Sequence, residues 1–164
     1  MAVGHSTVVS PEEEAAVKEY SYEFLEAARY GELDDLNLIF SHPRLKELIR
    51  FQSLVEEETG TSPLMLASAN GHLDCMRFLI ESVQVDVNYS NKSGNTALHW
   101  ASLNGHSACV EYLIIKNANV LAENIFHRTP FDEAIERDHK DCCELLVKEE
   151  VRLNNAQEDM QDEE

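Results

Sequence analysis

Histidines and cysteines recur together at one spacing, and both residue types could do chemistry. Three pairs share the pattern: His72 with Cys75, His106 with Cys109, and His139 with Cys142. Imidazoles and thiolates are the ligands that zinc prefers, and neighbouring cysteines can also form disulfides. Either chemistry requires the side chains to meet, so the elements that carry them decide the question.

A second candidate is His99, which stands beside Trp100, the single tryptophan of the chain. Thr96 precedes His99 by three residues, which is the spacing of a local structural hydrogen bond. The sequence contains no nucleophile elbow, phosphate-binding loop, HExxH pair or dinucleotide-binding fingerprint. We therefore expect a protein that is not an enzyme and that needs no cofactor and no small-molecule substrate.

The elements around these residues repeat. Residues 94–106, GNTALHWASLNGH, align with 60–72, GTSPLMLASANGH, and with 127–134, HRTPFDEA; residues 26–33, EAARYGEL, are a degraded copy. In each good copy, threonine or serine can cap a helix that begins at the next residue, and a second apolar helix follows the turn. One such helix pair cannot bury its apolar face alone, so neighbouring pairs must stack.

This pattern resembles the ankyrin repeat, whose units of about 33 residues carry T-P-L-H-x-A. The resemblance covers residues 23–148 and implies an all-α solenoid of about four helix-turn-helix units with short hairpin turns. We expect units at 23–55, 56–90, 91–123 and 124–148, an N-terminal extension with a capping helix at 1–22, and an acidic tail at 149–164. The first unit is irregular, because apolar residues between 40 and 60 predict an extra helical turn there.

Stacking argues against a metal site and against disulfides. Packed helices stand about 8–10 Å apart, so residues at equivalent positions are too distant to share one zinc ion or to form a disulfide. We therefore expect no metal, and we expect the cysteines to be small buried fillers in a reducing compartment. The resemblance further implies that His99 ties neighbouring hairpins together. Asp138 replaces the turn glycine of the last unit, as expected for a terminal cap.

The formal charge of -18, from 31 acidic and 13 basic residues, favours a basic partner. The same charge repels nucleic acid and anionic membranes, and no apolar run approaches the roughly 20 residues of a membrane span. Two acidic segments are expected to be solvated and to shield a cationic client. They comprise Glu56, Glu57 and Glu58, and then Glu158, Asp159, Asp162, Glu163 and Glu164.

Ankyrin proteins bind partners with hairpin tips and first helices, and this resemblance implies a set of contact residues. The set is Glu58, Thr59, Lys92, Ser93, Asn95, Leu103, Asn104, Ile125, Phe126, Arg128 and Arg137. Trp100 belongs either to the core or to an aromatic anchor in the groove. Phe126 either contacts the partner or folds back against the fourth unit.

Residues 91–105, NKSGNTALHWASLNG, are similar to a narrower family of small acidic ankyrin-repeat chaperones, and residues 26–36 are similar more loosely. That family is dedicated to ribosomal protein S-three of the small subunit. The resemblance implies shielding of this basic protein, its delivery to the nucleus for subunit assembly, and residence in cytoplasm and nucleus. The alternative is a regulatory ankyrin adaptor that sequesters a signalling or transcription protein.

Overall fold

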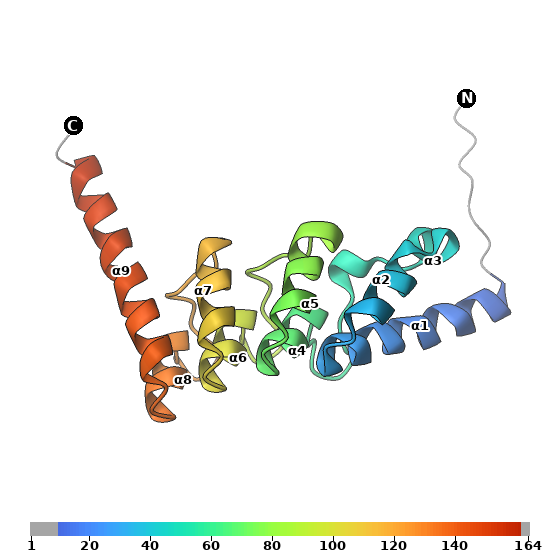
Figure 1. Cartoon of the computed structure of the whole chain (residues 1–164), viewed down its shortest axis with the longest axis horizontal. Helices are drawn as coiled ribbons and strands as arrows, with labels where there is room; N and C mark the ends of the chain where they lie inside the picture. The colour runs from blue at the N-terminus through green and yellow to red at the C-terminus, as the bar shows by residue number, and fades with distance from the viewer. Residues whose placement is uncertain (1–9, 162–164) are drawn as a thin grey trace.

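Helices in a single row make up the computed structural model, which describes the backbone of residues 10–161 and the side chains of residues 10–156 (Figure 1). No strand occurs among these residues. The helices are α1 (Pro11–Tyr30), α2 (Leu33–Ser41), α3 (Pro43–Leu48), η1 (Phe51–Ser53), α4 (Pro63–Ala69), α5 (Leu73–Phe78), η2 (Leu79–Val83), α6 (Ala97–Leu103), α7 (Ser107–Ile115), α8 (Pro130–Glu136) and α9 (Lys140–Gln161).

Four helix pairs stack along the row: α1 with α2, α4 with α5, α6 with α7, and α8 with α9. The first helices contact one another in the order α1, α4, α6 and α8, and the second helices follow as α2, α5, α7 and α9. The predicted all-α stack of four units is therefore confirmed. The extra helical structure predicted in the first unit is also present, as α3 and η1.

Side-chain caps set the helix starts that the sequence predicts. The hydroxyls of Ser10, Ser62, Thr96 and Thr129 each accept a hydrogen bond from the backbone N–H three residues later. In α1 the carboxylate of Glu13 also accepts from the Ser10 N–H at 3.0 Å, which completes a capping box. These bonds satisfy N–H groups that have no partner within the helix.

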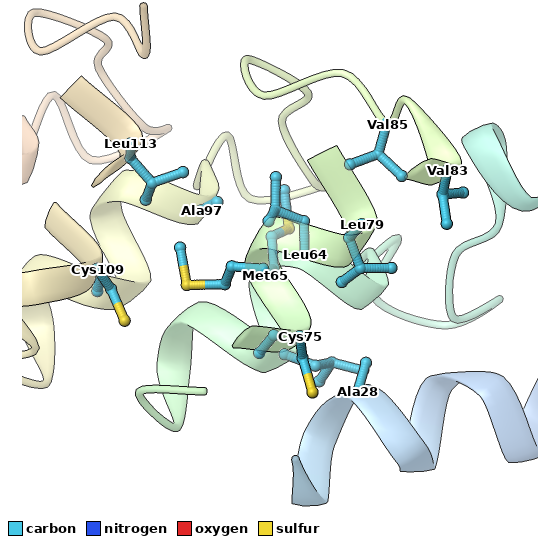
Figure 2. Close-up of a cluster of buried hydrophobic side chains, with 14 of the residues drawn as sticks. Ala28, Leu64, Met65, Cys75, Leu79, Val83, Val85, Ala97, Cys109 and Leu113 are labelled. Carbon is cyan, nitrogen blue, oxygen red and sulfur yellow. The ribbon is translucent and has the colours of Figure 1, made fainter. Parts of the chain in front are cut away.

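The core runs continuously through the units because small residues line the first helices. Ala28, Ala67, Ala101 and Ala134 are completely buried, which lets successive first helices approach closely. Figure 2 shows larger side chains of this core: Leu64 and Met65 of α4 lie between Leu79 of η2 and Ala97 of the next unit. Removing one such buried leucine costs about 2–5 kcal/mol of unfolding free energy in typical cores.

Both outer units are longer than the predicted boundaries suggest. Helix α1 runs across the boundary at residues 22 and 23, and α9 runs across the boundary at 148 and 149. The backbone of the expected solvated tail is helical through Glu158 and Asp159. Once the first turns of a helix have formed and packed, each further residue extends it at a lower entropic cost than the first turn required. The side chains of these two residues, and the whole of Asp162, Glu163 and Glu164, lie outside the described residues.

Candidate partner-binding surface

Three hairpin turns form a ladder beside the helices, and we call residues 56–60, 91–95 and 124–128 together the hairpin surface. The Lys92 N–H donates to the Thr59 carbonyl at 3.1 Å, and the Ile125 N–H donates to the Ser93 carbonyl at 3.1 Å. Four residues predicted as contacts therefore lie side by side along one ladder. The surface is continuous over three units, as a binding role requires.

Asparagine side chains hold each turn of the ladder, a role that the sequence reading missed. Asn91 Oδ1 accepts from the backbone N–H groups of Ser93 and Asn95, both at 3.0 Å. Asn124 Oδ1 makes the same pair of bonds one unit later, and its Nδ2 donates to Asn95 Oδ1 at 2.9 Å. Asn95 is thus half-buried in a structural link. The recurrence of asparagine 33 residues apart was the available signal.

His99 is a structural group, as the sequence predicts. Its Nδ1 accepts from the Thr96 N–H at 3.2 Å, and its Nε2 donates to the Arg128 carbonyl at 3.0 Å. The ring is buried, and this burial holds the pKa of His99 below its ordinary value. One neutral imidazole therefore joins the third unit to the hairpin of the fourth.

Trp100 packs against the core and is half-buried. Its indole nitrogen is shielded from solvent and has no hydrogen-bond partner among the described residues. This favours the core interpretation over a groove anchor. Leu103 is half-buried, while Asn104 is exposed and donates from Nδ2 to the Trp100 carbonyl at 2.9 Å.

Ile125 and Phe126 are the apolar part of the hairpin surface. Their exposed fractions are 61% and 70%. The alternative in which Phe126 folds back against the fourth unit is therefore wrong, because a packed ring would lose most of that exposure. Adjacent exposed apolar side chains at a turn tip are typical of a contact surface.

Two charged residues predicted to meet a client are instead engaged within the chain. Glu56 accepts from Arg29 at 2.5 Å and from Thr59 Oγ1 at 2.6 Å, so this carboxylate positions the first turn. Arg128 forms ion pairs with Glu133 and Glu136, and the Glu136 hydrogen bond raises the pKa of the guanidinium. These two side chains stabilise the surface itself.

The remaining predicted contacts stay on the surface. Glu57, Glu58 and Arg137 are exposed. Lys92 is exposed too, and its ammonium donates to the Glu57 carbonyl at 2.7 Å. The outward charge of the hairpin surface is therefore carried mainly by side chains of the first two turns.

The recurring histidines form hydrogen bonds between units, and the recurring cysteines are packed as free thiols. His72, His106 and His139 each donate from Nε2 to a carbonyl of the preceding unit: those of Arg29 at 3.0 Å, Ala69 at 3.0 Å and Leu103 at 3.1 Å. The cysteines are free thiols, and burial raises the pKa of Cys109 and of Cys142 to about 11. Within residues 10–156, no three metal-ligating side chains gather in one site.

Stacked helix pairs that share a ladder of hairpin turns define a solenoid repeat protein, a class whose extended surface binds other proteins. The model of the family described as ankyrin repeats (3 copies) matches residues 24–124, which is more than half of the chain. The chain belongs to the ankyrin repeat family.

A solved structure is similar over most of the chain. It is the crystal structure of the yeast ribosomal protein Rps3 in complex with its chaperone Yar1, of which one chain is 33% identical with a TM-score of 0.72. The similarity covers 79% of this chain and 92% of that chain. Among curated proteins, no sequence matches. In the part of the chain that the structure describes, no helix has the length and apolar character needed to cross a bilayer.

Proposed function

We propose that the chain is a chaperone for a newly made basic protein of the small ribosomal subunit, of the Rps3 type. The observation that carries the proposal is the similarity at 33% identity and TM-score 0.72 to a chain of the Rps3–Yar1 complex. The ladder of hairpin turns, and the use of His99 and of the recurring histidines as hydrogen-bond links between units, agree with a binding role rather than catalysis.

The proposed mechanism is charge masking together with docking on the hairpin surface. A ribosomal protein before assembly lacks the rRNA phosphates that neutralise its lysines and arginines. A chain of formal charge -18 supplies carboxylates in their place, and Ile125 and Phe126 add apolar contact. Release follows when rRNA competes for the same cationic groups of the client. Such a chaperone accompanies its client from the cytoplasm into the nucleus.

Binding of purified Rps3-type protein, measured by calorimetry in a salt series, tests this proposal. We expect a specific complex whose affinity falls at least about tenfold between low and high salt, because exposed charge pairs are screened. A maltose-binding protein without basic tracts serves as the control. Absence of a complex at low salt would overturn the proposal, and an affinity independent of salt would remove charge masking from the mechanism.

Affinity purification from cell extract separates the chaperone from the regulatory adaptor. Co-purification of the small-subunit protein in stoichiometric amount supports the chaperone. Recovery of one signalling or transcription protein, with no ribosomal protein, supports the adaptor instead.

A further inference from the structure

Two hollows flank α1 in the first unit, and of the residues that line them only those of the first hairpin turn, residues 56–59, were predicted as contacts. One, of about 780 Å³, lies between α1 and residues 54–59. The other, of about 510 Å³, lies between α1, α2 and α3. Tyr22 and Glu26 line both hollows, so the two form one surface around α1, which we call the first-unit surface.

The first-unit surface carries excess negative charge. Five glutamates and two basic residues line the larger hollow. One of the basic residues, Arg29, is already paired with Glu26 at 2.9 Å and with Glu56 at 2.5 Å. Four carboxylates and no lysine or arginine line the smaller hollow. The larger hollow therefore presents the exposed side chains of Glu57 and Glu58 with little internal neutralisation.

Apolar and aromatic groups accompany these carboxylates. Tyr22 is 64% exposed although it stands in the middle of a packed helix. Leu54 and Val55 line the larger hollow and are half-buried, and Leu38, which is largely exposed, lines the smaller one. An exposed tyrosine beside carboxylates suits a guanidinium, which can stack on the ring while it pairs with the acid.

We propose that the first-unit surface binds a protein segment in which arginine or lysine side chains are interspersed with apolar ones. The cationic groups pair with Glu57 and Glu58, one of them stacks on Tyr22, and the apolar side chains fill the hollow beside Leu54 and Val55. Charge complementarity selects this occupant, because nucleic acid and anionic lipid would be repelled. The proposal deepens the proposed function, on which it rests for the identity of the partner, and it extends the contact region from the first turn of the hairpin surface onto α1.

Matched variants of the full chain test the site. The double variant Glu57→Gln/Glu58→Gln removes two charges from the larger hollow, and Glu111→Gln/Glu144→Gln removes two exposed charges from α7 and α9. Tyr22→Ala has a close control in Tyr30→Ala, because both tyrosines are on α1 and both are 64% exposed, while Tyr30 lines neither hollow. All of these side chains are exposed, so folding should be preserved, as circular dichroism would verify.

Two probes are titrated calorimetrically against each variant: the Rps3-type protein, and a synthetic peptide of about twelve residues that carries arginines between leucines. We expect the Glu57/Glu58 and Tyr22 variants to weaken both complexes at least about fivefold, and the controls to change them less than about twofold. Equal weakening by variant and control, or no weakening, overturns the site.

The two probes also keep this inference separate from the proposed function. If the Rps3-type protein binds tightly and the first-unit variants do not change its affinity, the proposed function stands and the first-unit site is overturned. If the peptide binds in a manner that depends on Tyr22 and Glu57 but the Rps3-type protein does not bind, the site stands and the proposal of a ribosomal client is overturned. If neither probe binds, both the proposed function and the first-unit site are overturned.

Discussion

The ring of His139 occupies the space that a side chain at Gly105 would need. A Cβ built on Gly105 would lie 2.5 Å from His139 Nδ1, while His139 Nε2 donates to the Leu103 carbonyl at 3.1 Å. The same arrangement joins Gly71 to His106 one unit earlier. Each of these turn glycines therefore leaves the space that the histidine ring of the next unit occupies. Asp138 takes the equivalent turn position in the fourth unit, where no further repeat histidine follows among the described residues.

Substitution of the glycine between the two helices of a unit should therefore destabilise the fold where the histidine of the next unit packs against that glycine. Gly105→Ala introduces a Cβ at φ 73° and displaces the His139 ring, so we expect a loss of roughly 2 kcal/mol in unfolding free energy. Asp138→Gly, at φ 58°, should change it by less than about 0.5 kcal/mol. Urea unfolding measures both. A gain in stability from Asp138→Gly as large as the loss from Gly105→Ala would show that backbone conformation, not the histidine contact, governs these turns.

His99 should make stability depend on pH below neutrality. Burial lowers the pKa of His99 in the folded state, whereas the unfolded chain takes up the proton near its ordinary value of about 6.5. The unfolded state therefore binds more protons in this window, so stability is fully present above pH 6.5 and is lost as the pH falls toward the lower folded pKa. Protonation of Nδ1 also ends its acceptance from Thr96.

The measurement is the unfolding free energy between pH 7.5 and 5.5. His99→Gln should lower stability at pH 7.5 by about 1–3 kcal/mol through the lost link to Arg128, and should flatten the acid slope. His127→Gln, which removes a largely exposed histidine, is the control and should keep the slope of the unmodified protein. An unchanged slope in His99→Gln would contradict the assignment.

The buried thiols should resist modification in the folded protein. The thiolate is the reactive form, and burial raises the pKa of Cys109 and of Cys142 to about 11. At pH 7.5 we expect a disulfide reagent such as DTNB to modify the half-buried Cys143 first, and the buried cysteines only upon unfolding. Cys143→Ser should remove the early phase. Rapid modification of all four thiols in the native protein would contradict this packing.

Phe126 should contribute to partner binding and little to folding. Because its side chain is 70% exposed, Phe126→Ala should change the unfolding free energy by less than about 0.5 kcal/mol. Its affinity for the Rps3-type protein should fall about tenfold if the ring anchors the hairpin surface. Ile115→Ala is the matched control, since Ile115 is 66% exposed but lies on α7. An equal loss of affinity in both variants would contradict a specific role for Phe126.

The spacing of the repeats also explains a local irregularity. The left-handed residue that ends the second helix follows the repeat histidine by 12 positions in the second unit (His72 to Gln84) and by 11 in the third (His106 to Asn117). The additional residue is absorbed in η2, a π-helical turn at Leu79–Val83. A single insertion in a helix commonly takes this form because it leaves the helix on both sides in register.

The sequence alone determined the features that depend on short-range geometry. The hydroxyl caps that start α4, α6 and α8, and the bond between Thr96 and His99, each join residues three apart. Such bonds form wherever the helix begins, whatever surrounds it. The stack itself followed from the repeat, because each helix pair needs a neighbour to cover its apolar face.

Only the tertiary structure decided which side chains reach the surface and which are neutralised. Glu56 meets Arg29, 27 positions away, and the sequence gives no sign that this carboxylate is occupied while Glu57 and Glu58 are not. Phe126 and Trp100 are both aromatic, yet one is largely exposed and the other packs on the core. The first-unit surface likewise arises where α1, α2 and residues 54–59 meet. These outcomes depend on distances between segments far apart in the chain, which the packing of whole units fixes and no local pattern encodes.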